Sequence, residues 1–373
     1  MDTIEKLKAL SEDSRYDLAC ACGTLREEHR RRGPEGRWLY PVALPQGGYT
    51  VLLKTLLSNS CHNDCRYCPL RSETNVRRCT LMPEEVARTF MEYRKRKKVF
   101  GLFLSSAVMN SPDYTMERLT AVACLLRYKY NFRGYIHLKI IPGASDAAIE
   151  EALSLSTAVS LNIETPGRKH MEQLSGKKDY DRDILRPIKL IGKLTSKGMR
   201  FSNVKCTTQF IVGASDEKDS EIVNSMAGLY EKMNVRRIYF SAYQKGLGHP
   251  TIPGERNFLS NTNDAFMREH RLYQVDFLIR KYGFSRDDIV LDGAGNLSLE
   301  KDPKELWADQ HPEFFPVRIN TSDKATLLRV PGLGPETVKR VINIRREQRI
   351  SSLEGLGLKG KRLEKIKRYV IAE

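Results

Sequence analysis

Six short apolar segments, separated by helix-like segments, constrain the fold of this chain more than any other feature. Many are rich in β-branched residues, and turn residues separate them from the rest of the chain, as expected for buried strands. Strands that alternate with helices form βαβ units and a parallel sheet. The six segments are residues 49–58, 98–106, 134–141, 158–164, 205–213 and 236–243.

Six such units within about two hundred residues predict an α/β fold, namely a partial (β/α)6 barrel similar to a TIM barrel. In such a barrel the chemistry lies at the C-terminal ends of the strands. The helix predicted between the first two strands begins at Pro83, where Glu84 and Glu85 also suit a helix N-terminus. The basic run Arg94–Lys98 suits its C-terminal end.

The chain is expected to contain four regions. Residues 1–48 form an N-terminal extension with a charged helix candidate at Thr24–Arg32. Residues 49–245 form the barrel, and residues 246–323 form a helical extension and linker, with an amphipathic helix candidate around Arg268–Tyr282. The remaining region, residues 324–373, is predicted to be a small all-α module.

Composition restricts the compartment and the partners. No apolar run among the 373 residues approaches the length needed to span a bilayer. The charged N-terminus lacks the pattern of a signal peptide, so a cytoplasmic location, or a nuclear one in a nucleated cell, is expected, with no membrane partner. The net charge of +16 suits a partner with a phosphate backbone, although acidic membranes also attract such a protein.

The excess charge is concentrated at the C-terminal end. Lys324–Glu373 carries 13 Lys and Arg against five Glu and no Asp, a net charge of +8 and half that of the chain. A basic segment confined to one end is typical of a binding appendage.

The stretch SCHNDCRYCP places Cys61, Cys65 and Cys68 just after the first predicted strand. Three thiols are one too few for a tetrahedral structural site and an odd number for disulfides. At this spacing they can ligate three irons of a [4Fe–4S] cluster and leave the fourth iron open for reactivity. The alternatives are a zinc knuckle that includes His62 or a distant cysteine, and a cluster without reactivity.

This CxxxCxxC motif, with Tyr67 before its last cysteine, is similar to that of the radical S-adenosylmethionine (SAM) superfamily. The resemblance implies that the open iron binds the methionine moiety of SAM. The reduced cluster then cleaves SAM to methionine and a 5′-deoxyadenosyl radical, which abstracts a hydrogen atom from the substrate. An electron donor such as flavodoxin or ferredoxin is implied as a partner.

The resemblance also implies contacts to SAM at the ends of later strands. Ser105 and Ser106 stand where the family commonly has an acidic residue near the SAM amino group. Asn162 and Glu164 correspond to ribose contacts, although Glu164 could also be a surface acid. Gly213 corresponds to an adenine contact or to an ordinary turn glycine.

No catalytic residue can be assigned from the sequence. Tyr243, at the end of the sixth predicted strand, is one candidate, and its simpler interpretation is a buried aromatic residue. Cys79, shortly after the cluster motif, is the other, and its simpler interpretation is a residue that leads into the next helix. Cys20 and Cys22 could contribute to an auxiliary cluster, but spacing supplies no partners for them. Cys124 fits the apolar face of a predicted helix, so we expect its thiol to pack in the core.

The basic end contains two helix patterns joined by the turn Pro-Gly-Leu-Gly-Pro. Gly332 and Gly334 allow a tight turn whose backbone N–H groups, beside Lys339 and Arg340, suit a phosphate. This stretch resembles a helix-hairpin-helix DNA-binding motif. A weaker second hairpin follows, with Gly357 in its turn and Lys361 as a further cation. Backbone contacts of this kind predict salt-sensitive binding to DNA without sequence specificity, and a helical hairpin for protein contacts is the alternative.

Nearly the full chain resembles a group of radical SAM proteins named for DNA modification or repair. The expected function is therefore a radical SAM enzyme that acts on a base or sugar of DNA. A target base would have to be unpaired or extruded to reach the barrel. The alternatives are the same chemistry on RNA, and a DNA-binding protein with a structural or redox-sensing cluster.

Overall fold

The computed structural model of the protein describes residues 1–14, 38–44, 47–256 and 262–372. The helix predicted at Thr24–Arg32, and Cys20 and Cys22, lie outside the described residues. The chain forms two compact units. The barrel unit comprises Met1–Glu217 and Gly228–Glu269, and the C-terminal unit comprises Lys218–Ala227 and His270–Glu373.

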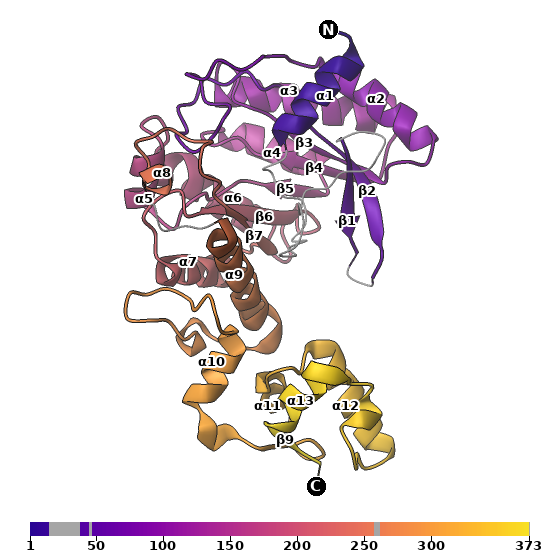
Figure 1. Ribbon diagram of the computed structural model, residues 1–373. Helices are drawn as coiled ribbons and strands as arrows, with labels where there is room; N and C mark the ends of the chain where they lie inside the picture. Colours follow the sequence, from indigo (N-terminus) through magenta and orange to yellow (C-terminus); the bar gives the residue numbers. More distant parts are fainter. Residues whose placement is uncertain (15–37, 45–46, 257–261, 373) are drawn as a thin grey trace. The chain divides into compact units, whose positions relative to one another are not determined.

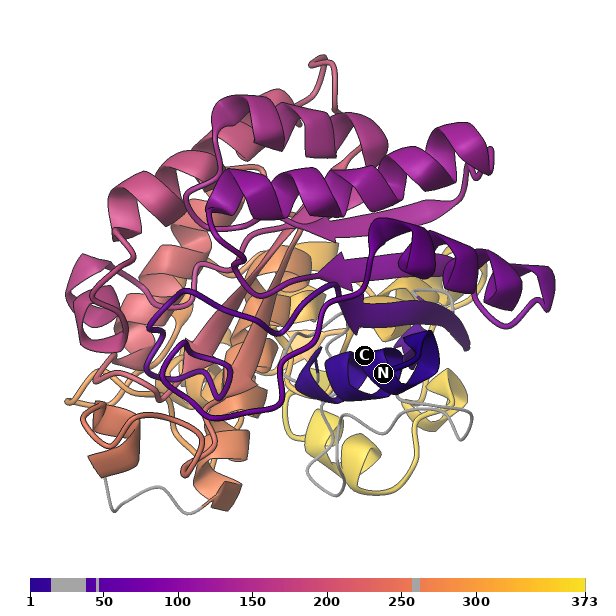
Figure 2. The same cartoon turned by 90° about the horizontal axis from the view of Figure 1, so that it is seen from above.

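A seven-stranded sheet forms the centre of the barrel unit, and its strands follow one another in chain order. All six predicted strands are present and pair in parallel. The sequence pattern did not predict β1, which lies before them and pairs antiparallel with β2. The sheet curls into a half-barrel (Figure 2). The strands are β1 (Leu39–Ala43), β2 (Tyr49–Leu56), β3 (Gly101–Ser105), β4 (Tyr135–Lys139), β5 (Ala158–Ser160), β6 (Lys205–Val212) and β7 (Arg237–Ala242).

Helices connect these strands and cover the outer face of the sheet (Figures 1 and 2). The predicted helix at Pro83 is confirmed, because Pro83 is its first residue and its last turn contains Arg94 and Lys95. The elements are α1 (Thr3–Asp13), α2 (Pro83–Lys95), α3 (Pro112–Cys124), α4 (Asp146–Leu155), α5 (Arg168–Leu174), α6 (Arg186–Leu194), α7 (Asp219–Lys232) and α8 (Pro253–Arg256), with π-helical segments Leu125–Lys129 and Tyr180–Leu185.

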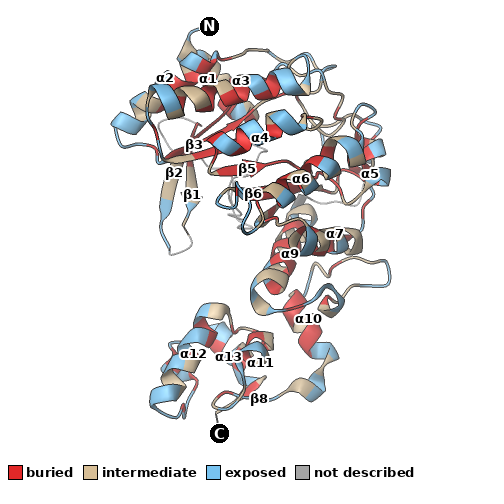
Figure 3. Cartoon of the chain, turned by 180° about the vertical axis from the view of Figure 1, so that it is seen from behind, coloured by how far each residue is buried: buried red, intermediate tan, exposed pale blue. Residues whose placement is uncertain are grey.

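The core of the barrel unit lies between the sheet and these helices, where the buried colour of Figure 3 is concentrated. Outward-facing strand residues such as Leu102, Leu138 and Phe240 are fully buried. Burial of such side chains is the main favourable term in folding. None of the described helices is long and apolar enough to cross a membrane.

The C-terminal unit is helical. Its last part contains α11 (Lys324–Arg329), α12 (Pro335–Glu347) and α13 (Gly360–Lys367). Residues 324–373 are not all-α as predicted, because the β-branched pair Val370–Ile371 forms β9, which pairs in parallel with β8 (Val317–Arg318). The packed region therefore extends to the N-terminal side of Lys324. The other elements are the C-terminal part of α9 (Thr262–Tyr282), α10 (Pro303–Gln310) and 3-10 turns at Arg286–Asp288, Pro312–Phe314 and Glu354–Leu356.

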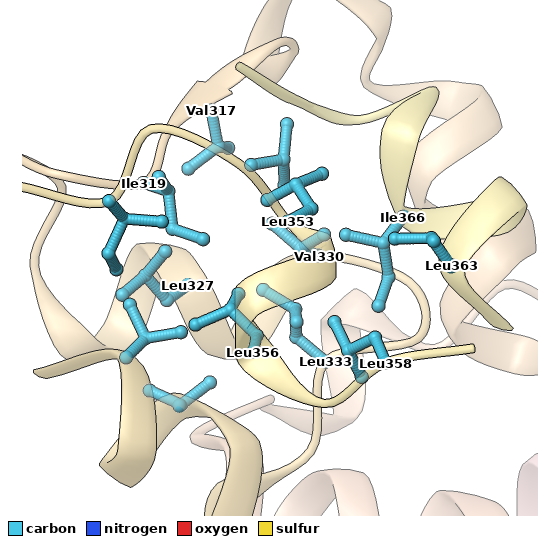
Figure 4. Close-up of a cluster of buried hydrophobic side chains, with 14 of the residues drawn as sticks. Val317, Ile319, Leu327, Val330, Leu333, Leu353, Leu356, Leu358, Leu363 and Ile366 are labelled. Atoms are coloured by element: carbon cyan, nitrogen blue, oxygen red, sulfur yellow. The ribbon is translucent and has the colours of Figure 1, made fainter. Parts of the chain in front are cut away.

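A compact apolar core holds these last elements together (Figure 4). Leu327 of α11, Val338 of α12 and Ile366 of α13 are completely buried in it. α11 and α12 form the first predicted helix pair, joined by a turn in which Gly332 has a φ of +86°. The second pair consists of the 3-10 turn Glu354–Leu356 and α13, with Gly357 at a φ of +69° between them.

Candidate active site

A cavity of about 200 Å³ lies at the C-terminal ends of the strands in the barrel unit. Its wall combines the loop that follows β2 with the ends of β3 to β7. Nearly all of the predicted site residues line it, namely Cys61, Cys65, Tyr67, Cys68, Ser105, Ser106, Asn162, Glu164 and Tyr243. Gly213 and Cys79 are not part of this lining.

The three cysteines lie in the loop between β2 and α2, called the cluster loop here (residues 57–82). The N–H of Asn63 donates to Cys61 Sγ and the N–H of Leu70 donates to Cys68 Sγ, each at 3.4 Å. Backbone N–H bonds to sulfur are one of the means by which proteins tune an iron–sulfur cluster. Three thiols with backbone N–H donors are the kind of ligand set that such a cluster uses.

Burial raises the pKa of the Cys65 thiol, and it raises the pKa of Cys68 to about 12. A thiol must lose its proton to ligate a metal, so cluster assembly on these residues would release protons. No group of three or more His, Cys, Asp or Glu in the described part of the chain is arranged to hold a metal ion. The three thiols remain proposed ligands of a cluster.

The segment after α5 holds the cluster loop in place. The N–H of Gly176 donates to Asp64 Oδ2 at 2.8 Å, and Ser175 Oγ donates to the other oxygen of the same carboxylate. Lys177 Nζ donates to the carbonyl of His62 at 2.6 Å. Because His62 and Asp64 lie between Cys61 and Cys65, these contacts fix the path of the backbone between the two thiols.

Arg78 organises the second half of the cluster loop. Its guanidinium donates to the carbonyls of Leu70 and Arg71, each at 2.8 Å, and of Thr74 at 3.0 Å. A further bond reaches the carbonyl of Asn59. One side chain thus satisfies backbone carbonyls on both sides of the three cysteines, where no helix or sheet provides backbone partners.

A positive charge lies beside the thiols. Lys178 Nζ donates to the Tyr67 hydroxyl at 3.2 Å. Burial lowers the pKa of Lys178, but Cys65 and Glu164 outweigh burial and raise it above its ordinary value. Burial, with Cys65 and Glu164 nearby, raises the pKa of Tyr67, which therefore stays a neutral phenol. Lys178 offsets negative charge on thiolates and on Glu164.

Glu164 is held in an unusual backbone conformation. Its φ is +66°, a left-handed value that is uncommon outside glycine. Two backbone bonds to β6 fix it there, because its N–H donates to Gln209 O at 3.0 Å and its carbonyl accepts from Ile211 N–H at 2.8 Å. The side chain is only 6% exposed. Strained residues of this kind cluster at functional sites, where the surrounding structure enforces them.

The other predicted SAM contacts include Asn162, Ser106 and Gly213, and each already makes a hydrogen bond within the protein. Asn162 Oδ1 accepts from Lys139 Nζ at 2.6 Å, so the amide is oriented by a lysine that the sequence analysis did not select. The hydroxyl of Ser106 donates to the carbonyl of Ala107 at 2.7 Å. Gly213 has a φ of +88°, and its N–H donates to Glu217 Oε1 at 2.6 Å. The N–H of this turn glycine is therefore already engaged.

The two candidate catalytic residues lie in different places. The hydroxyl of Tyr243 donates to the Glu255 carboxylate, and burial raises the pKa of Tyr243. The backbone of Cys79 pairs with that of Asn59, and its N–H also donates to the Asn59 side chain at 2.7 Å. Tyr243 thus belongs to the cavity wall, whereas Cys79 belongs to the base of the cluster loop.

Sequence reasoning missed several residues of this site. Lys139 and Gln209 line the cavity from strands β4 and β6. Each is a polar residue directly before an apolar pair, Ile140–Ile141 or Phe210–Ile211, and its position near the strand end is a signal that could have identified it. Lys178 and Arg78 lie in irregular loops, where no periodicity indicates the direction of a side chain.

With this geometry established, comparison with known proteins identifies the domain. Residues 55–228 match the sequence model of the Radical SAM superfamily. The match begins in β2 and includes the cluster loop and the ends of β3 to β6. The chain therefore contains a radical SAM domain, and its cofactors are a [4Fe–4S] cluster and SAM.

Solved structures with similar folds share little sequence with this chain. Methylornithine synthase (PylB) is 14% identical, with a TM-score of 0.44 over 59% of this chain and 62% of that chain. HydG, an FeFe-hydrogenase maturase from Carboxydothermus hydrogenoformans, is 16% identical, with a TM-score of 0.46 over 60% and 50%. SuiB from Streptococcus suis is 14% identical, with a TM-score of 0.44 over 62% and 48%. No curated protein matches the chain.

Proposed function

We propose that this protein is a radical SAM enzyme that acts on DNA and modifies or repairs a base or a sugar. The barrel unit supplies the radical chemistry, and the end of the C-terminal unit binds the nucleic acid. The observation that carries the DNA assignment is the pair of glycine turns in the small basic region that contains α11, α12 and α13.

In the barrel unit, Cys61, Cys65 and Cys68 are the proposed ligands of the cluster. When bound, the cluster and SAM supply a 5′-deoxyadenosyl radical that abstracts hydrogen from the substrate. Glu164 is the proposed partner of the ribose hydroxyls, and its backbone pairing with β6 fixes the carboxylate at the cavity. Lys178 would balance the charge of the thiolates.

In the C-terminal unit, the first turn fits the requirements of a phosphate site. A Cβ on Gly332 would lie 2.7 Å from Ile366 Cγ1, so the close packing of the turn requires glycine. Gly334 is the N-cap of α12, and the first N–H groups of a helix have no acceptor within it. Lys339 on α12 and Lys361 on α13 are exposed, and each follows one of the two glycine turns closely in sequence. Such amides and cations bind the phosphates of DNA or of RNA.

Arg340 has an additional role in the proposed module. Its guanidinium donates to the carbonyl of Leu356 at 2.8 Å, which ties α12 to the second turn. The two turns are thus fixed to one another, and a rigid pair can contact successive phosphates on one nucleic acid. Mutation of Arg340 would therefore affect the fold of the module as well as its charge.

The test is fluorescence anisotropy of the full-length protein with unrelated DNA duplexes at several salt concentrations. Gly332→Ala should weaken binding, because the methyl group strains the turn and displaces α13. Gly355→Ala is the control, since a Cβ there meets only Ser352 Oγ, at 4.0 Å. Lys339→Ala should flatten the salt dependence of log affinity by about 0.9 on every sequence, whereas Lys193→Ala, an exposed change on α6, should not.

Equal DNA affinity in Gly332→Ala, Lys339→Ala and both controls would remove the module from the nucleic-acid interface. Binding of single-stranded RNA that greatly exceeds binding of DNA would instead move the assignment to RNA. SAM cleavage without DNA should be unchanged in all four variants. This result would separate DNA binding by the C-terminal unit from the radical chemistry of the barrel unit.

A further inference from the structure

A second cavity, with a volume of about 330 Å³, lies in the C-terminal unit beside the first glycine turn. We call it the turn pocket, and its lining includes Gln274, Phe277 and Tyr282 of α9, Lys304 of α10, Gly334 of the turn and Arg362 of α13. Protein cavities that bind small organic ligands typically have volumes of about 300–1,000 Å³. The volume of the turn pocket is therefore sufficient for an organic ligand.

The charged side chains that line the turn pocket already have partners within the C-terminal unit. The pairs are Arg362 with the carbonyl of Gly332, Lys304 with the carbonyl of Leu333, Lys365 with Glu305, and Asp302 with Gln274. These contacts connect α9, α10, α13 and the turn, so they fix the walls of the pocket. Because transfer of an ion out of water is costly unless the ion finds a partner, the turn pocket suits a neutral polar ligand better than an ion.

Tyr282 offers a hydroxyl group to such a ligand. A Cβ on Gly334 would lie 3.2 Å from the hydroxyl oxygen of Tyr282, so this oxygen lies against the turn. Lys304 holds the ring in place, with its Nζ 4.5 Å from the ring centre. Burial, with Asp302 nearby, raises the pKa of Tyr282, so the phenol keeps its proton. Among the residues that the structure describes, none forms a hydrogen bond with this hydroxyl, which can therefore donate to a ligand.

Phe277 contributes an aromatic ring to the same pocket. The residue is 43% exposed, so a large part of its ring is accessible to a ligand. The guanidinium of Arg280 lies 5.3 Å from the centre of this ring. Exposed aromatic rings are the surfaces on which bases stack in proteins that bind single-stranded nucleic acids. The turn pocket thus combines a stacking surface with a neutral hydrogen-bonding group.

A nucleobase matches these features, because it is neutral and planar and carries hydrogen-bonding groups along its edge. The turn that is the proposed phosphate site also forms part of the pocket wall. In an intact duplex each base is paired and stacked inside the helix, so only its phosphate can reach the turn. An unpaired nucleotide can place its phosphate on the turn and its base in the adjacent pocket.

We propose that the turn pocket binds the base of an unpaired nucleotide in DNA, while a neighbouring phosphate lies on the first glycine turn. This inference rests on the proposed function and deepens it, because it defines the substrate as DNA that contains an unpaired nucleotide. The proposed chemistry of the barrel unit has the same requirement, since a paired base is not accessible to an active site.

The experiment measures, by fluorescence anisotropy, the binding of three DNA duplexes to the full-length protein. One duplex is fully paired, the second has a single bulged thymidine, and the third has a bulged abasic nucleotide at the same position. The two bulged duplexes differ only in the base. The wild type should bind the thymidine bulge about tenfold more tightly than the abasic bulge, as expected for one stacked base.

Two variants test the two groups of the turn pocket separately. Phe277→Ala should weaken binding of the thymidine bulge about tenfold, and Tyr282→Phe should weaken it about fivefold because one hydrogen bond is lost. Binding of the abasic bulge and of the paired duplex should not change. The matched controls are Phe100→Ala and Tyr128→Phe, which alter exposed aromatic residues of the barrel unit and should have no effect.

Equal affinity of the wild type for the two bulged duplexes would overturn the inference. It would also be overturned if Phe277→Ala and Tyr282→Phe both kept the wild-type preference for the thymidine bulge. Gly332→Ala separates this inference from the proposed function. If Gly332→Ala weakens binding of all three duplexes but the base of the bulge has no effect, only the turn pocket is contradicted. If Gly332→Ala binds all three duplexes as the wild type does, the proposed function itself is contradicted.

Discussion

At the scale of single residues, Glu164 is the proposed ribose contact, and its backbone and its side chain have separate roles. The backbone continues the pairing with β6 in a left-handed conformation, and the carboxylate lines the cavity. Such a conformation persists only if the surroundings enforce it. We interpret this enforcement as the means by which the chain presents a carboxylate to the ribose of SAM.

Glu164→Asn should raise the dissociation constant of SAM about tenfold, because a hydrogen bond from a charged group to a bound polar ligand is lost. Asparagine tolerates a positive φ better than most residues, so the backbone should be retained. Calorimetry of the anaerobic protein measures the change, with exposed Glu172→Gln as the control. Wild-type SAM affinity in Glu164→Asn would exclude this residue from the site.

Nearly all of the site residues predicted from the sequence line the cavity, because they lie at the ends of strands or in the loops that follow them. Cys61, Asn162 and Tyr243 all lie just after apolar segments, and the ends of parallel strands converge at one edge of a sheet. The sequence could not predict Lys178, which reaches Tyr67 from a loop more than a hundred residues later. Long-range contacts between irregular segments leave no local pattern.

At the scale of elements, the cluster loop is a long irregular segment whose backbone carbonyls need side-chain hydrogen-bond donors, because they are not paired in a helix or sheet. Arg78 provides several of them from within the loop. A loop that must place three thiols around one cluster cannot fluctuate freely, so we regard Arg78 as a positioning residue for the cysteines.

Arg78→Gln should lower the iron content per chain and reduce the free energy of unfolding by about 2–4 kcal/mol, since several hydrogen bonds from a charged group are lost. Arg77→Gln is the control, because Arg77 is exposed and next in sequence. Iron analysis and urea unfolding provide the two readouts. If the Arg78 and Arg77 variants retain iron equally well, the positioning role is wrong.

In the C-terminal unit, α10 contacts the first glycine turn through a buried lysine. Lys304 is 6% exposed, its Nζ donates to the carbonyl of Leu333 at 2.7 Å, and it lies 4.5 Å from the centre of the Tyr282 ring. Burial lowers the pKa of Lys304 to about 7. The stability of this unit should therefore depend on pH.

Between about pH 7 and pH 10.5 the unfolded chain keeps the Lys304 proton while the folded chain loses it, so stability should rise with pH in that window. The slope for one proton approaches about 1.4 kcal/mol per pH unit. Lys304→Met should flatten it, and the exposed change Lys359→Met should not. Urea unfolding followed by Trp307 fluorescence in a Trp38→Phe background measures this. An identical slope in both variants would contradict the role of Lys304.

The elements themselves were largely predictable, and the exceptions have physical causes. The six parallel strands followed from apolar runs, and α2 from its proline and acidic start. The sequence did not predict β1 because Pro41 and the glycines that follow the strand favour a turn or loop, although proline is tolerated in an edge strand. The second hairpin begins with a 3-10 turn rather than a helix, because Gly355 and Gly357 disfavour a longer helical run.

At the scale of the whole molecule, two proposed tasks belong to two different units of the chain. The radical SAM domain and its cofactors belong to the barrel unit, and the proposed nucleic-acid contacts belong to the C-terminal unit. Composition could suggest the second task, because half of the net charge lies in the last fifty residues. It could not identify the substrate, since phosphate contacts carry no information about a base.

Cys61, Cys65 and Cys68 are proposed to hold a cluster that cleaves SAM. The most direct measurement is the formation of 5′-deoxyadenosine by anaerobically reconstituted and reduced protein, without DNA. Wild type and a Cys124→Ala control should form it, and a variant with all three cysteines changed to alanine should form none. Product from the triple variant, or a wild type that binds zinc alone and leaves SAM intact, would contradict the account.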